Sequence, residues 1–248
     1  MRVAYFDCFS GASGDMILGA LIDAGLDVAQ LRKDLGKLQL TGYDLKVKKV
    51  TKKGIAGTQA LVMVEQDNPS QPHRHLSDIR NIIEESDLDK SIKEKGMAIF
   101  GRLAEAEAKV HNEEVDHIHF HEVGAIDSIV DVIGAVSGLA ALGIEEVFCS
   151  PIHIGTGTVE CAHGTLPVPA PATMEILRGI PVYSTGLNAE LLTPTGAAVL
   201  MSLSSAFGPM PSMTIQGIGY GAGTSDLPIP NLLRLIIGEL HCRASFSS

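Results

Sequence analysis

The sequence of 248 residues has no tryptophan, few other aromatic residues and an excess of negative charge. Aromatic residues make up 4% of the chain, and 19 Lys and Arg stand against 29 Asp and Glu, which gives a net charge of −10. No lysine follows Lys109. Proteins that bind nucleic acids need basic side chains for the phosphates and commonly use aromatic side chains to stack on the bases. We therefore expect no nucleic-acid partner.

The sequence also lacks a long apolar run and a paired cysteine motif. The longest nearly apolar stretch, residues 126–144, contains Asp127 and Asp131, and no signal-peptide core follows Met1. These features predict no membrane span and no membrane partner. The four cysteines are scattered without a Cys-x-x-Cys pair, which is typical of reduced thiols. We therefore expect a cytoplasmic protein.

The order of apolar patterns predicts an α/β fold, with a mixed sheet and flanking helices. Residues 3–6 have the pattern of a buried strand, and a helical pattern follows from Met16. Residues 45–50 and 55–64 have the alternation of two half-buried strands joined by a turn. Further predicted strands at 117–120 and 147–154 lie on either side of an apolar helix at 126–142.

Two domain arrangements are compatible with this order. One is a single large domain over residues 1–240, and the other is a pair of closely packed subdomains. In the second case, residues 1–66 and 116–240 are joined by helical residues 67–115, and residues 241–248 form a tail in both cases. The composition supports either arrangement, because 45% hydrophobic residues are enough for a full core.

A cluster of histidines and carboxylates is the most informative feature of the sequence. Residues 116–122 read Asp-His-Ile-His-Phe-His-Glu, and a strand there places His117, His119 and His121 on one face, about 6.5 to 7 Å apart. Asp127 and Asp131 follow four residues apart on the predicted helix. Imidazole and carboxylate groups together can hold a transition metal. The alternative is a solvent-facing strand, or histidines that are hydrogen bonded in the core.

Other residues are further candidates for this site. His153 lies beyond the predicted helix, and Asp7 ends the first strand, where its carboxylate can hold a divalent ion. The predicted metal ligands are therefore His117, His119, His121, Asp127, Asp131, Asp7 and His153.

A loop of small residues joins the first strand to the first helix. Free amides at the start of a helix favour a phosphate or carboxylate, so this loop is a candidate binding site. Its residues are Ser10, Gly11, Ser13, Gly14 and Asp15. The loop lacks the Gly-Lys-Ser/Thr of a nucleoside-triphosphate loop, and a tight turn capped by Ser13 or Asp15 is the other interpretation. The glycine run at 217–223 lacks the spacing of a dinucleotide loop.

Four blocks of sequence carry a resemblance to a known family. In chain order they read FDCFSGASGDM at 6–16, HFHEVGAID at 119–127, LTPTGA at 192–197 and GIGYG at 217–221. With these blocks the chain resembles, over about residues 1–240, the nickel insertion proteins of the nickel-pincer cofactor pathway. The resemblance implies a lyase-class chelatase that inserts Ni(II) into pyridinium-3,5-bisthiocarboxylic acid mononucleotide, forming one carbon–nickel and two sulfur–nickel bonds.

The resemblance also implies partners and cofactors. In the family, CTP is hydrolysed to CMP and pyrophosphate with Mg(II) or Mn(II), and the product serves lactate racemase, so the apo racemase is an implied partner. Such proteins usually continue into a carboxy-terminal domain that is associated with the nucleotide site, whereas this sequence stops soon after Leu240. We therefore expect a carboxy-terminal domain or a separate polypeptide as a further partner.

The implied reaction needs a base, because a carbon–nickel bond displaces a ring proton. Glu122 and His121 are the nearest candidates by sequence. Two other functions use the same ligands: a non-catalytic nickel carrier, and a metal-dependent hydrolase in which they activate a water molecule.

Overall fold

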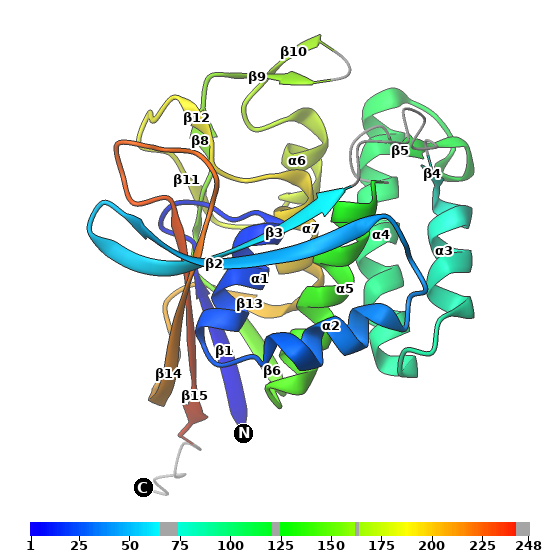
Figure 1. The fold of residues 1–248 in the computed structure, drawn as a ribbon. Helices are drawn as coiled ribbons and strands as arrows, with labels where there is room; N and C mark the ends of the chain where they lie inside the picture. Colours follow the sequence, from blue (N-terminus) through cyan, green and yellow to red (C-terminus); the bar gives the residue numbers. More distant parts are fainter. Residues whose placement is uncertain (65–73, 121–124, 162–163, 242–248) are drawn as a thin grey trace, which may run out of the picture.

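One seven-stranded sheet organises the chain in the computed structural model, which describes residues 1–64, 74–120, 125–161 and 164–241 (Figure 1). β1 pairs in parallel with β6 and antiparallel with β15, so the sheet is mixed and the predicted α/β class is confirmed. The strands in spatial order are β13 (Ser204–Phe207), β6 (Glu146–Cys149), β1 (Arg2–Asp7), β15 (Leu232–Leu240), β14 (Met213–Ala222), β3 (Ile55–Val64) and β2 (Tyr43–Lys52).

Strands from distant parts of the sequence alternate within this sheet. β1 lies between strands that begin at Glu146 and Leu232, and β3 pairs with β14. The predicted hairpin is present as β2 and β3, which pair antiparallel along their whole length. Because neither the first 64 residues nor the last hundred can complete the sheet alone, the chain forms a single α/β unit.

The helices cover one side of the sheet (Figure 1). They are α1 (Gly14–Asp23), α2 (Val28–Gly36), α3 (Leu76–Glu85), α4 (Lys90–His111), α5 (Ile126–Ala141), α6 (Pro171–Ile176) and α7 (Pro194–Leu203). The apolar side chains of α1 and α5, among them Ile17, Leu18 and Ile133, are fully buried in one core with Phe6. No helix within the described ranges is both long and apolar enough to cross a membrane.

The glycine run near the end of the chain serves the packing of α1 on the sheet. It lies within β14, where a Cβ at Gly219 or Gly221 would collide with the backbone of α1 at Ala20 or Met16. The helix can therefore lie directly on the strand, a contact that side chains at these positions would prevent.

Short two-stranded sheets lie beyond the carboxyl end of β1 (Figure 1). They pair β7 (Ile152–His153) with β11 (Val182–Tyr183), β8 (Gly155–Thr156) with β12 (Ala189–Glu190), and β9 (Thr158–Cys161) with β10 (Gly164–Pro167). A fourth pair, β4 (Arg74–His75) with β5 (His119–Phe120), lies beside α3 and α4. The first three pairs bring several polar side chains to the end of the sheet where β1 leads into α1.

The predicted strand at 117–120 is only partly correct. A 3-10 helix, η1 (Val115–His117), follows α4, and β5 begins at His119. The chain turns here because α4 ends at Asn112 in the left-handed conformation, after which the His117 amide donates a hydrogen bond to the Glu114 carbonyl. His117 therefore does not share a strand face with His119.

Candidate functional site

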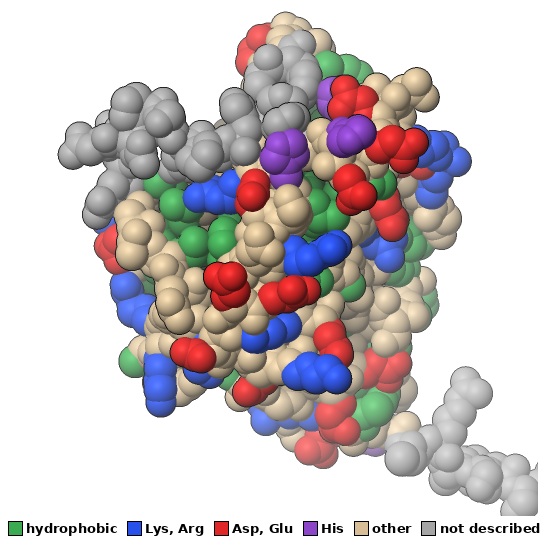
Figure 2. Space-filling view, turned by 90° about the vertical axis from the view of Figure 1, so that its right-hand side faces the viewer, with side chains coloured by type: hydrophobic (Ala, Val, Ile, Leu, Met, Phe, Trp, Pro, Cys, Tyr) green, Lys and Arg blue, Asp and Glu red, His purple; other side chains and the backbone are tan. Residues whose placement is uncertain are grey.

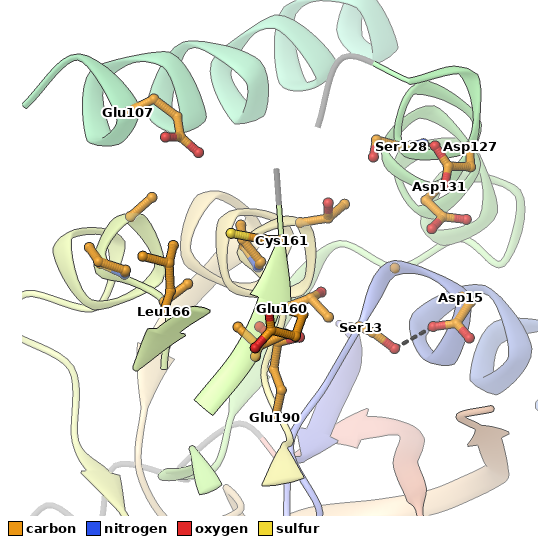
Figure 3. Close-up of a pocket in the computed structure, with 18 of the residues that line it drawn as sticks. Ser13, Asp15, Glu107, Asp127, Ser128, Asp131, Glu160, Cys161, Leu166 and Glu190 are labelled. Atoms are coloured by element: carbon orange, nitrogen blue, oxygen red, sulfur yellow. Dashed lines mark hydrogen bonds between the residues drawn. The ribbon is translucent and has the colours of Figure 1, made fainter. Parts of the chain in front are cut away.

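A cavity of about 550 Å³ lies where the first turns of α1, α5, α6 and α7 come together (Figure 3). Ser13, Gly14 and Asp15 line it from α1, and β9 and the last turn of α4 complete its wall. The four helices begin at the same cavity because their connecting loops all lie at the same end of the sheet. Helix starts present free amides and positive partial charge, so the backbone at this end of the four helices favours negatively charged groups in the cavity.

Three carboxylates from α1 and α5 lie at one end of the cavity (Figure 3). Asp15 accepts hydrogen bonds from the Ser13 hydroxyl and, at 2.9 Å, from the Met16 amide. Asp127 accepts one from the Ser128 amide at 2.8 Å. Asp131 Oδ1 is closed off from solvent and has no hydrogen-bond partner in the described part of the chain. An unpartnered buried carboxylate oxygen is costly, and this one lies beside two further carboxylates.

Gly14 allows this close approach. A Cβ on Gly14 would collide with the carboxylate of Asp131. The first residue of α1 is thus a glycine at the point where the helix contacts α5, and the two helices can place their acidic residues side by side.

The electrostatics of the three carboxylates favour the uptake of positive charge. Burial raises the pKa of Asp15, although its hydrogen bonds oppose the effect, and burial also raises the pKa of Asp127. Burial raises the pKa of Asp131 well above its ordinary value, and the charges of Asp15 and Asp127 add to the effect. The three carboxylates therefore take up protons more readily than ordinary aspartates do, and a cation beside them would offset the same repulsion.

The rest of the cavity is also acidic. Glu107 and His111 lie one turn apart on α4, with Oε2 and Nε2 3.5 Å apart. Glu160 accepts a hydrogen bond from Thr165 at 2.5 Å, and the Cys161 thiol donates to the Gly164 carbonyl at 3.3 Å. Glu190 lines the same region, and no Lys or Arg is among the described residues that line the cavity. Such a lining attracts cations.

Three of the five predicted loop residues lie at the cavity. Ser13, Gly14 and Asp15 line it, whereas Ser10 is fully buried behind it. Gly11 has a φ of +77°, and a Cβ there would collide with the Leu191 carbonyl, so this glycine serves the packing of the loop. Asp15 occupies the start of α1 with its own carboxylate.

The other predicted ligands are distributed as follows. His153 is buried away from the cavity lining, with Nδ1 3.0 Å from the Phe9 carbonyl and Nε2 3.0 Å from the Thr185 hydroxyl. Asp7 also lies outside the lining and forms an ion pair with Arg234. Both groups are thus engaged within the fold.

The histidine segment lies largely beyond what the structure describes. His117, on η1, is exposed, and Figure 2 shows histidine side chains gathered at one end of the helical face, near β4 and β5. The backbone of His119 pairs with His75, but the His119 side chain, His121 and Glu122 lie outside the described residues. Across the described ranges, no three His, Cys, Asp or Glu side chains are arranged to hold a metal ion.

Sequence reasoning missed the acidic residues Glu107, Glu160 and Glu190 and the hydroxyl of Thr195, which all line the cavity. They come from four separate elements, so no local spacing connects them. The Thr-Pro-Thr-Gly block at 193–196, which is part of the family resemblance, is the signal in the sequence that points to this region.

Comparison with known proteins shows a clear similarity. A family model described as nickel insertion protein matches residues 4–246. The chain is 56% identical over 240 residues to the pyridinium-3,5-bisthiocarboxylic acid mononucleotide nickel insertion protein of Desulfitobacterium hafniense (strain DSM 10664 / DCB-2), covering 97% of this chain and 59% of the relative. It is 49% identical over 247 residues to the protein of the same name from Geobacillus kaustophilus, covering 96% and 60%.

A third relative, a putative nickel insertion protein of Dictyoglomus thermophilum, is 49% identical over 240 residues, which cover 97% of this chain and 61% of the relative. The chain thus spans about three-fifths of the length of the curated relatives that it matches. No solved structure matches it.

Proposed function

Since this chain belongs to the nickel insertion protein family, we propose that it binds Ni(II) and inserts it into pyridinium-3,5-bisthiocarboxylic acid mononucleotide. The observation that carries this proposal is the group of Asp15, Asp127 and Asp131 at one end of the cavity, with Asp131 Oδ1 buried and unpartnered among the described residues. Nickel is a substrate of this reaction, and a divalent cation offsets the repulsion among these carboxylates.

The proposed nickel ligands are Asp127 and Asp131 together with imidazole groups from His119 and His121. Nickel prefers imidazole nitrogen to an all-carboxylate site, and these histidines precede α5 by only a few residues. A set of histidine and carboxylate ligands exchanges metal more readily than a closed thiolate cage. The site can therefore release the ion to the organic substrate.

The organic substrate brings charges of both signs to the cavity. Its pyridinium ring is a cation, which the carboxylates of the lining favour, whereas its two thiocarboxylates and its phosphate are anions that need nickel or hydrogen-bond donors to offset the acidic lining. Formation of the carbon–nickel bond replaces a ring C–H bond: the carbon electron pair binds nickel and the proton passes to a base. We propose Glu122 or His121 for that base, on the ground of their closeness in sequence to Asp127.

Three finer parts of the proposal concern the remaining length of the relatives. We propose that the family reaction hydrolyses CTP with Mg(II) or Mn(II), and that a carboxy-terminal domain or a separate polypeptide supplies the CTP site. The product would serve a racemase of the lactate racemase type, whose apo form is a proposed partner.

The test combines nickel binding with conversion of the precursor. Calorimetric titration of the chain with Ni(II) should give at least about tenfold weaker binding for Asp131→Asn than for the unaltered protein, because one charged ligand is lost. Mass spectrometry of the precursor, with and without CTP, should show less nickel-containing product for the variant. Asp44→Asn is a matched control, since Asp44 is exposed and lies outside the cavity.

Each outcome of this test is informative. Equal nickel affinity of Asp131→Asn and the unaltered protein would overturn the assignment of the carboxylates. Tight nickel binding without any conversion of the precursor, even with CTP and a full-length relative that is active in the same assay, would identify a carrier instead of a chelatase.

A further inference from the structure

The acidic cavity has to hold an anion as well as cations if it takes a mononucleotide, because the ribose carries a phosphate. No Lys or Arg is found among its described lining residues, so helix starts and hydroxyl groups are the available donors. Three helices of eight or more residues begin at the cavity, namely α1, α5 and α7. They differ in whether an acidic residue already occupies the first turn.

Two of these helices already carry an acid at their start. Asp15 lies in the first turn of α1 and Asp127 in the first turn of α5, and each carboxylate accepts a hydrogen bond from a backbone amide of its own helix. A phosphate at either helix would meet this negative charge. The first turn of α7 contains no acidic residue.

The donors of the first turn of α7 are almost all accounted for. Pro194 has no N–H, the Gly196 amide donates to the hydroxyl oxygen of Thr193 at 3.2 Å, and the Ala197 amide donates to the Thr193 carbonyl at 2.9 Å. The amide of Thr195 is therefore the donor of this turn that remains for a ligand.

The side chain of Thr195 points to the same conclusion. Thr195 lines the cavity and is only 9% exposed, yet its hydroxyl makes no hydrogen bond within the described part of the chain. A hydroxyl that faces a cavity and has no protein partner is available to a ligand oxygen. Because amide and hydroxyl belong to one residue, they can bind the same phosphate group.

The start of α7 is held rigidly in this position. The Thr193 amide donates to the Ala12 carbonyl at 3.2 Å, and a Cβ on Gly196 would stand 2.5 Å from that carbonyl oxygen. The glycine thus lets α7 begin directly against the loop that precedes α1. A donor fixed before binding loses little entropy when the ligand arrives.

We propose that the start of α7, through the amide and hydroxyl of Thr195, binds the phosphate monoester of the mononucleotide. The loop of residues 10–15 is then not the phosphate site, because Asp15 occupies it. This inference rests on the proposed function, since it assumes that the cavity takes a pyridinium mononucleotide. In the ring of that substrate, the nitrogen that carries the ribose lies opposite the carbon between the two thiocarboxylates, so the phosphate and the nickel ion contact different groups of the cavity lining.

The test uses two probes that differ only by the phosphate, nicotinic acid mononucleotide and nicotinic acid riboside, each titrated into the chain by calorimetry. We expect the unaltered protein to bind the mononucleotide more tightly than the riboside. Thr195→Val keeps the shape of the side chain and removes the hydroxyl. It should weaken binding of the mononucleotide about tenfold, as for a hydrogen bond to a charged group, and leave binding of the riboside unchanged.

Two further variants serve as comparisons. Ser13→Ala tests the competing loop and should leave the preference for the mononucleotide intact. Thr173→Val is the matched control, because Thr173 is also a buried threonine whose hydroxyl has no partner among the described residues, but it lies outside the cavity lining. It should affect neither ligand.

Other results would overturn the inference in distinguishable ways. Equal weakening of both ligands by Thr195→Val, or loss of the preference in Ser13→Ala, would exclude Thr195 as the phosphate donor. Equal binding of both ligands by the unaltered protein would show that the cavity binds the nucleoside part and has no phosphate site. Binding of neither ligand would overturn this inference and the organic substrate of the proposed function together, and the nickel titration would still test the carboxylates separately.

Discussion

Replacement of Asp131 by asparagine should stabilise the nickel-free protein and weaken the nickel complex. In the nickel-free protein, Asp131 Oδ1 is buried without a partner among the described residues, and Asp15 and Asp127 lie beside it. Asparagine has nearly the same shape and no charge. The substitution therefore removes repulsion and desolvation of a charge without opening a cavity.

The gain in the free energy of unfolding from Asp131→Asn should increase as the pH rises. The pKa of Asp131 is raised in the folded protein, so the folded state retains a proton that the unfolded chain has already lost. Stability from this group is thus fully present below the ordinary aspartate pKa of about 3.9, and it is lost as the pH rises through the folded pKa. Each unit of the pKa shift corresponds to about 1.4 kcal/mol. We expect Asp131→Asn to gain on the order of 1 to 3 kcal/mol at pH 8 and close to nothing at pH 4.

The assay is thermal unfolding by circular dichroism in chelator at several pH values, then in excess nickel. A gain of 1 kcal/mol raises the Tm of a domain of this size by about 2 to 4 °C. Nickel at 100 times its Kd for the unaltered protein would stabilise that protein by about 2.7 kcal/mol and a variant with tenfold weaker binding by about 1.4 kcal/mol, so the advantage of the variant should shrink by about 1.3 kcal/mol. If Asp131→Asn is less stable than the unaltered protein at pH 8 in chelator, the carboxylate is not repelled in the native state and the electrostatic reasoning is wrong.

Two further predictions follow from the same geometry. Gly14→Ala should displace the Asp131 carboxylate, lower stability by about 1 to 3 kcal/mol and weaken nickel binding, whereas Gly101→Ala, which meets nothing within 4 Å, should leave nickel binding unchanged, as urea unfolding and calorimetry would show. Among the three described cysteines, iodoacetamide at pH 8 should label Cys161 far faster than Cys8 or Cys149, because the latter two are fully buried and the pKa of the Cys8 thiol is raised well above its ordinary value. Peptide mass spectrometry measures the labelling, and rapid modification of Cys8 in the folded protein would contradict it.

Local patterns were sufficient for much of the secondary structure. The strand, small-residue loop and helix at the start of the chain, the hairpin of β2 and β3, and the helix α5 all occur where apolar periodicity predicts them. These elements depend on spacing within a few turns, which the sequence displays directly. The strand predicted from His117 failed, because the left-handed end of α4 at Asn112 leads into a 3-10 turn.

The site was predictable only in part. The spacing of Asp127 and Asp131, four residues apart on one helix, and the place of Asp15 after a glycine-containing loop can be read along the chain, and all three residues line the cavity. That the three carboxylates come together was not predictable, since it depends on Gly14 and on the crossing of α1 and α5. The proposed role of Thr195 also depends on contacts that no pattern within the sequence reveals.

The α/β class, the long helices and the family follow from composition, periodicity and motifs along the chain. The order of the strands, the close packing that the glycines of β14 allow and the meeting of four helix starts at one cavity are apparent only in the folded protein. The physical reason is that burial, charge repulsion and steric fit act between residues that are neighbours in space, and β1 shows this best, because its two partner strands begin at Glu146 and Leu232.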